Sequence, residues 1–171
     1  MPPDLAQIYD AHAAALHAYA LSLTRCQAEA RDVLQDVFTT LARQGERWSA
    51  VESPRAWLLC LTRRAVSARV RRAVVAERAA EKLSADPWFE LPADADAPQF
   101  ARALTDAMRS LPAEQREVVH LKLWEALSFQ QIADLLGISP NTAASRHRYG
   151  LTKLRTVLQP LWEEIRHLPQ P

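Results

Sequence analysis

The residues best placed for binding chemistry are the cations and small polar side chains of residues 139–158. This segment carries Arg146, Arg148, Lys153 and Arg155 and no acidic residue. Arginine suits phosphate or guanine, and Asn and Ser are common donors to bases or phosphate. The candidate contacts on or beside the outer stripe of one helix are Asn141, Thr142, Ala144, Ser145, Arg146, Arg148 and Tyr149. The pattern predicts a helix that binds duplex DNA, whereas composition alone would also allow an ordinary hydrated helix.

Helix signals on both sides predict how this segment is positioned. Ser128 can cap a helix, and Gln131 three residues later completes a capping box. Gly137 stands where a left-handed residue must end that helix. Ser139 and Pro140 then supply an N-cap and a first helical residue. These signals predict a helix-turn-helix, whose second helix enters the DNA major groove.

The inner side of that second helix is predicted from its periodicity. Ala143, His147, Gly150, Leu151 and Leu154 are expected to face inward. A glycine inside a helix costs about 1 kcal/mol against alanine, so Gly150 indicates a close approach or a bend. His147 is expected to be a half-buried structural residue rather than a DNA contact.

Composition predicts an all-α chain. The sequence holds three glycines, is rich in Ala, Leu and Arg, and has few β-branched alternations. It has no apolar run near the ~20 residues of a membrane span and no secretory signal. Cys26 and Cys60 are expected to be reduced thiols. These features predict a cytoplasmic protein without membrane insertion.

Charge and proline content predict two small helical domains joined by a flexible acidic linker. Residues 53–82 hold eight basic and two acidic residues, whereas residues 83–98 hold four acids and no base. The segment SADPWFELPADADAP, with its prolines and acids, is not expected to form a regular element. The expected divisions are 1–83, a linker over 84–98, and 99–171 with the helix-turn-helix. Two basic blocks suit a protein that touches nucleic acid twice.

Enzymatic patterns are absent from the sequence. It has no glycine-rich phosphate loop, no HExxH, no CxxC and no nucleophile elbow, and its five histidines are scattered. We therefore expect no catalytic residue, no cofactor and no metal site.

Both halves of the chain resemble an extracytoplasmic-function sigma factor of bacterial RNA polymerase. EARDVLQDVFTTLAR and PRAWLLCLTRRAVSARVRR resemble the family's second conserved region. LPAEQREVVHLKLWEALSFQQIADLLGISPNTAASRHRYGLTKLR resembles its fourth. The resemblance covers roughly residues 5–72 and 99–157, and the order of the two regions makes it specific.

For the first half, the resemblance implies polymerase docking and contact with the −10 promoter element. The docking residues would be Asp32, Gln35, Asp36 and Thr39, which share one helix face. The alternative for this face is plain hydration. The −10 contacts would be Trp48, Arg63, Arg64, Ser67 and Arg71. Trp48 or the loop of residues 50–53 is the candidate contact for a flipped base, while Trp57 is expected in the core. The family usually has Asn at Arg64 and Asp at Ala68.

For the second half, the resemblance implies that the helix after Pro140 contacts the −35 element. Ser145 and Arg146 match the family pattern, whereas Ala144 replaces a basic residue and Arg148 is placed to compensate. The implied partners are core RNA polymerase, promoter DNA and an anti-sigma factor, with the chain acting as a monomer. The competing hypothesis is a stand-alone regulator that binds duplex DNA without polymerase.

Overall fold

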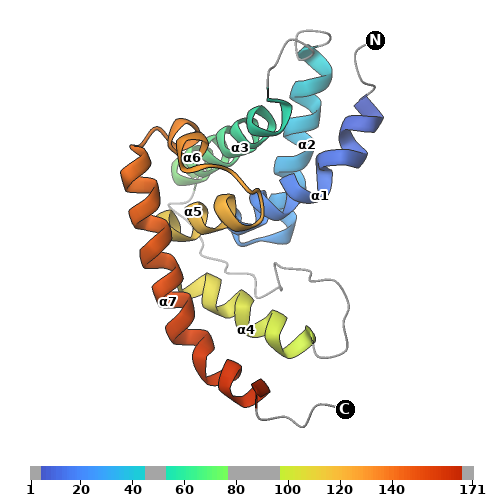
Figure 1. Cartoon of the computed structure of the whole chain (residues 1–171). Helices are drawn as coiled ribbons and strands as arrows, with labels where there is room; N and C mark the ends of the chain where they lie inside the picture. The colour runs from blue at the N-terminus through green and yellow to red at the C-terminus, as the bar shows by residue number, and fades with distance from the viewer. Residues whose placement is uncertain (1–4, 45–52, 77–96, 167–171) are drawn as a thin grey trace. The chain divides into compact units, whose positions relative to one another are not determined.

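The computed structural model describes residues 5–44, 53–76 and 97–166, and every regular element in these ranges is a helix. The predicted all-α class is confirmed (Figure 1). The chain divides into two compact units, Met1–Trp88 and Phe89–Pro171. Most of the expected linker lies outside the described residues. The helix after it begins at Ala97, two residues earlier than predicted.

The N-terminal unit consists of three helices that pack pairwise. They are α1 (Leu5–Thr24), α2 (Gln27–Gln44) and α3 (Pro54–Ala76). Their buried side chains recur at helical spacing, as burial of one stripe per helix requires. The core residues that are almost inaccessible to water include Leu16, Tyr19, Val33, Val37, Leu58 and Leu59. This core holds α2 against α3, which carry the predicted docking and −10 residues.

A tight turn between α1 and α2 sets the start of α2. Arg25 has φ +59°, and its backbone N–H donates to the Leu21 carbonyl at 2.8 Å. The Thr24 hydroxyl donates to the Ala20 carbonyl at 3.0 Å, and the Cys26 amide donates to that hydroxyl at 3.4 Å. These bonds satisfy polar groups that a helix end leaves open.

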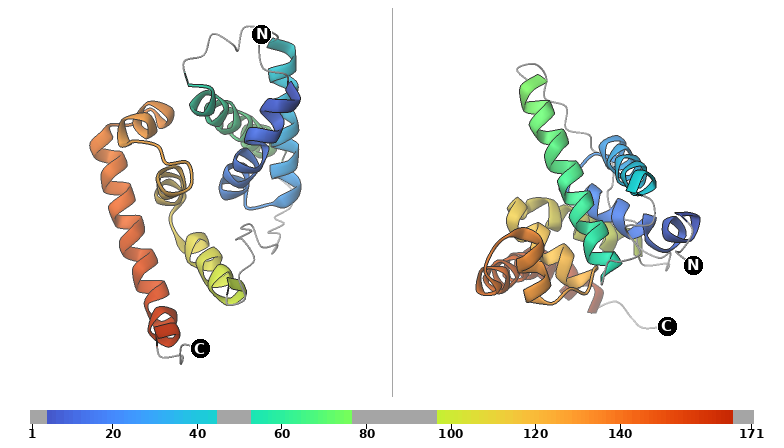
Figure 2. Two further views of the ribbon diagram at one scale, coloured as in Figure 1. Left: turned by 45° about the vertical axis from the view of Figure 1, so that its right-hand side comes forward. Right: turned by 90° about the horizontal axis from the view of Figure 1, so that it is seen from above.

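The C-terminal unit is organised around one long helix. Its elements are α4 (Ala97–Ser110), α5 (Ala113–Leu123), α6 (Phe129–Leu136) and α7 (Pro140–Arg166). Helix α7 packs against α4, α5 and α6, which follow one another along its length (Figure 2). It passes through Pro160 without ending. The predicted recognition helix is therefore the first part of a 27-residue rod.

The predicted helix-turn-helix is confirmed at the level of its caps. The Gln131 amide donates to Ser128 Oγ at 3.1 Å, and the Ser128 amide donates to Gln131 Oε1 at 2.8 Å. Gly137 ends α6 in the left-handed region with φ +68°. The Thr142 amide donates to Ser139 Oγ at 3.0 Å, which makes Ser139 the cap of α7. Local hydrogen bonds therefore fix where both helices begin.

Candidate functional sites

The predicted DNA contacts on the outer side of α7 differ in their exposure to solvent. Asn141, Arg148 and Tyr149 are exposed, and Tyr149 retains 55% of its accessible surface. Thr142, Ala144, Ser145 and Arg146 are half-buried. The Arg148 guanidinium lies 5.2 Å from the Tyr149 ring centroid, within cation–π range. Among the predicted contacts, Arg148 is therefore the exposed cation, and it lies beside a large aromatic surface.

Two of the predicted contacts on α7 already have partners in the chain. The Arg146 guanidinium forms an ion pair with the Glu114 carboxylate at the start of α5. The Thr142 hydroxyl lies 2.8 Å from the Ser139 hydroxyl, so it belongs to the cap of α7. The sequence analysis missed Glu114 as the partner of Arg146. The chain holds many acidic residues, and the sequence alone does not show which of them packs beside α7.

The inner side of α7 follows the prediction at four positions and departs from it at one. Ala143, Gly150 and Leu154 are buried, and His147 is half-buried. The prediction that Leu151 faces inward is wrong, because this side chain keeps 36% of its accessible surface. A residue eight positions after Ala143 lies about 80° round an ideal helix, at the edge of the inner stripe rather than on it.

Gly150 marks the closest approach of α7 to α5. A Cβ atom added there would lie 2.6 Å from Cγ2 of buried Val119. The predicted close approach is therefore confirmed. The glycine allows α7 to pack directly on α5, and this packing sets how far the outer stripe of α7 stands from α5.

His147 occupies the contact between α5, α6 and α7. Its ring meets the Phe129 ring edge-on at 5.5 Å, and Lys122 Nζ lies 4.9 Å from the same Phe129 ring. Burial, and secondarily the positive charge of Lys122, lowers the pKa of His147 below its ordinary value of 6.5. His147 is half-buried, as expected, and its lowered pKa favours the neutral ring. Its buried Nε2 has no hydrogen-bond partner within the described chain, so the ring is held by packing rather than by a hydrogen bond at this atom.

The predicted −10 contacts on α3 share one side of that helix. Arg64 and Arg71 are exposed, and Arg63 and Ser67 are half-buried. At about 100° per residue, these four positions span roughly one third of the helix circumference. Trp48 lies outside the described residues. Trp57, expected in the core, is half-buried.

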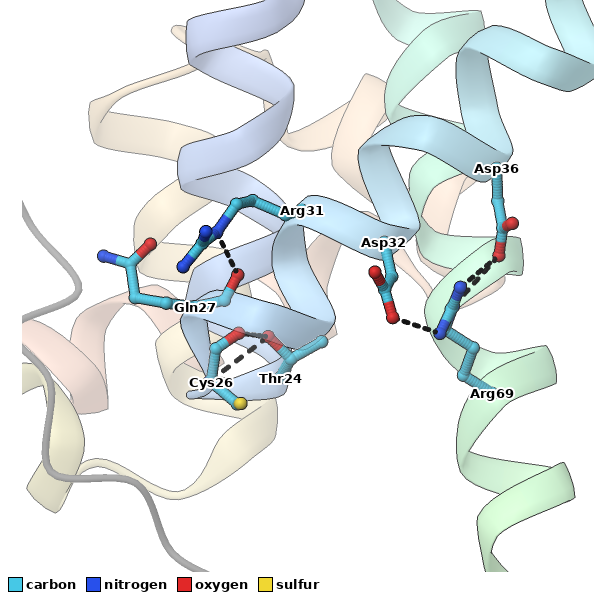
Figure 3. Close-up of polar contacts among 7 residues, drawn as sticks. All are labelled: Thr24, Cys26, Gln27, Arg31, Asp32, Asp36 and Arg69. Atoms are coloured by element: carbon cyan, nitrogen blue, oxygen red, sulfur yellow. Dashed lines mark hydrogen bonds and ion pairs between the residues drawn. The ribbon is translucent and has the colours of Figure 1, made fainter.

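The predicted docking face on α2 is occupied by a cation from α3 (Figure 3). Asp32, Gln35 and Thr39 are exposed, and Asp36 is half-buried. Arg69 Nε and Nη2 each lie 2.9 Å from Asp36 Oδ2, and Arg69 Nη1 lies 3.2 Å from Asp32 Oδ2. From the sequence, Arg69 was one of the basic residues of 53–82 with no assigned role. The structure distinguishes it from the neighbouring arginines by its ion pairs with Asp32 and Asp36.

A buried polar pair in the C-terminal unit was also missed. His120 Nε2 lies 3.6 Å from Glu125 Oε1, and both side chains are almost completely buried. The His120 ring stacks on Trp124 with centroids 5.4 Å apart.

Within the described ranges, no three His, Cys, Asp or Glu side chains are grouped closely enough to hold a metal ion. Nor is any helix of the described chain long and apolar enough to cross a membrane.

Comparison with known proteins agrees with this architecture. Residues 8–74 match the Sigma-70 region 2 family, and residues 101–154 match the Sigma-70 region 4 family. The chain is 34% identical over 160 residues to the ECF RNA polymerase sigma factor SigL of Mycobacterium tuberculosis, covering 90% of this chain and 88% of SigL. It is 31% identical to the RNA polymerase sigma factor CarQ of Myxococcus xanthus, covering 92% and 91% of the two chains.

A solved structure has the same fold. The sigma factor RpoE of Bartonella quintana, determined in complex with the anti-sigma factor NepR, superposes with a TM-score of 0.75 at 23% identity. The match covers 90% of this chain and 95% of that one. The chain therefore belongs to the extracytoplasmic-function family of RNA polymerase sigma factors. Its function is that of a sigma factor in transcription initiation, which is favoured over a stand-alone regulator, and this family is not one of catalytic enzymes.

Proposed function

We propose that the two units divide promoter recognition between them. Residues 99–171 bind the −35 element, and residues 1–83 bind core polymerase and the −10 element. The observation that carries this proposal is the outer stripe of α7 over residues 139–158, a segment that holds no acidic residue. This stripe belongs to the second helix of a helix-turn-helix whose two helices both begin at a capping serine. Within that stripe Arg148 is the open cation, and Asn141, Ser145 and Tyr149 lie beside it.

In the N-terminal unit, α3 supplies the −10 contacts and α2 supplies the docking face. Arg64 and Arg71 are exposed cations that suit phosphate. Ser67 and Arg63 follow on one side of them round the helix, and Trp48 lies in the preceding segment. The α2 face offers carboxylate, amide and hydroxyl oxygens from Asp32, Gln35, Asp36 and Thr39. An acidic face of this kind suits a partner surface rich in Lys or Arg.

The remaining parts of the proposal follow from family membership. The chain acts in the cytoplasm as a monomer, without cofactor, metal or catalytic activity of its own. An anti-sigma factor controls it, and the complex of RpoE with NepR supports this expectation. Residues 84–98 serve as the linker between the two binding units.

Run-off transcription tests the proposal. Core polymerase of the bacterium that encodes the chain is assayed with and without the protein on a genomic promoter library. The expected result is a set of new start sites that share an upstream motif. Absence of new starts, together with sequence-specific duplex binding by the protein alone, would instead support the stand-alone regulator.

Salt titration of the assembled promoter complex adds a quantitative check. Each phosphate contact contributes roughly 0.9 to the slope of log affinity against log salt concentration. Substituting Arg64 or Arg71 with Ala should lower the slope by about that amount. A slope that neither substitution changes would contradict the role of α3 in phosphate binding.

A further inference from the structure

The docking face of α2 already binds a guanidinium, which comes from the chain itself. Asp32 and Asp36 are four residues apart and lie on one helix face, and Arg69 of α3 lies between them (Figure 3). Two like charges at this spacing repel each other, so a cation placed between them is favourable. The fork of Arg69 reaches both carboxylates at once, which a lysine ammonium does less well.

Arg69 lies apart from the proposed DNA contacts of its own helix. Counting about 100° per residue, it is roughly 120–160° round α3 from Arg63, Arg64, Ser67 and Arg71. Its ion pairs are with Asp32 and Asp36 of α2. Arg69 therefore acts on the docking face rather than on DNA.

We propose that Arg69 is an intramolecular competitor for the polymerase-docking face, occupying the place that a basic side chain of core polymerase takes on docking. This inference rests on the proposed function of the α2 face. The pair of carboxylates shows which partner chemistry fits, because it coordinates a guanidinium through Oδ2 of both residues. A partner cation must displace Arg69 or share these carboxylates with it.

The exposure of the three side chains sets the strength of this competition. Asp32 keeps 57% of its side-chain surface, Asp36 43% and Arg69 31%, so water and salt screen both ion pairs. When only a fraction of the molecules has a free site, the apparent Kd rises by the inverse of that fraction. For two weak exposed pairs, we expect Arg69 to reduce core affinity by about three- to tenfold.

The test is the affinity of the full-length, fluorescently labelled chain for core polymerase without DNA. Arg69→Ala should bind about three- to tenfold more tightly at low salt, and the gain should shrink as salt is raised. Arg69→Lys should fall between Arg69→Ala and the unchanged chain, because one ammonium replaces the fork poorly. Arg102→Ala removes the same charge from an exposed position on α4 to which no contact is assigned, and should change core affinity by less than about twofold.

Asp32→Asn/Asp36→Asn separates the failure of this inference from failure of the docking face. The double variant should bind core polymerase more weakly, and adding Arg69→Ala to it should give no further gain. Unchanged core binding in the double variant would overturn the docking face itself. Weaker binding in the double variant, combined with unchanged or weaker binding in Arg69→Ala, would leave the face standing and overturn the competition. Should Arg69→Ala fail to fold by circular dichroism, the sign of the Arg69→Lys effect decides.

Discussion

The two basic helices, α3 and α7, use their arginines differently. Each has an arginine paired with a carboxylate of a neighbouring helix: Arg69 with Asp32 and Asp36, and Arg146 with Glu114. On α3 the paired arginine lies away from the proposed DNA contacts, so the pairing affects the docking face. On α7 the paired arginine is itself a proposed DNA contact, so we expect the pairing to affect DNA binding.

This difference shows why the charge of a segment overstates the cations available to a ligand. Residues 139–158 carry four basic side chains and no acid, yet Arg146 is paired with a carboxylate that lies on another helix. The field that DNA meets depends on the folded arrangement of both signs of charge. Substitutions of paired and open arginines should therefore have different consequences.

The largest effect is expected from Arg148, the exposed cation on the outer stripe of α7. Arg148→Ala should weaken promoter binding by the polymerase complex by about 1–3 kcal/mol, because a good side-chain contact to a base contributes that much. Gel shift or anisotropy with the matched promoter measures the loss. Lys153→Ala removes the same charge about 140° further round α7 and should change binding by less than about twofold. Equal losses in both variants would argue for a net-charge effect.

A smaller effect is expected where α7 packs on α5. Gly150→Ala places a Cβ 2.6 Å from Cγ2 of Val119, which is buried and stiff. Overpacking costs about 1–3 kcal/mol, and the better helix propensity of alanine returns about 1 kcal/mol. We expect a net loss of about 1 kcal/mol in urea unfolding.

A second substitution tests whether the clash is the cause. Val119→Ala combined with Gly150→Ala removes the methyl group that the new Cβ meets. The two changes should then be non-additive, with the double variant more stable than the sum of the single changes predicts. Strict additivity would show that Gly150 is not held by this contact.

The Glu114 pairing should give a smaller change in DNA binding. Glu114→Gln releases Arg146 and removes a negative charge near the proposed DNA surface. Binding of the polymerase complex to nonspecific duplex should rise about two- to fivefold at low salt, with a salt slope steeper by at most about 0.9. Asp134→Asn is the charge-matched control, because Asp134 is an exposed acid on α6. The same gain in both variants would mean that Arg146 is not restrained by Glu114.

The features predicted correctly from the sequence are those encoded by nearby residues. The capping box of Ser128 and Gln131, the left-handed Gly137 and the cap at Ser139 each depend on contacts three or four positions apart. Helical periodicity likewise located most of the buried stripe of α7. It failed at Leu151 because the assumed inner stripe was wider than the surface that the neighbouring helices cover.

The features that were missed depend on packing between helices. Arg69 meets Asp36 and Asp32 across 33 and 37 positions of sequence. Glu114 and Arg146 are likewise brought together only when α5 packs beside α7. A sequence rich in Arg, Asp and Glu allows many such pairings, and only the helix packing selects among them. The sequence therefore predicts which helices carry the proposed site residues, but not which of those side chains are already paired within the chain.

The smallest effect is expected from titration of His147, on the inner side of α7. Its pKa is lowered in the folded chain, first by burial and then by Lys122. The unfolded chain therefore binds more protons as pH falls through about 6.5, and the folded state loses stability below that pH. Above about pH 7.5 both states are neutral at this site and the contribution vanishes.

Hydrogen exchange of α6 and α7 amides between pH 7.5 and 5.5 should show faster opening at low pH, and His147→Gln should reduce that dependence. Because α3 carries no histidine, its amides should not gain this particular pH dependence. An identical pH response in the variant would assign the effect to groups other than His147.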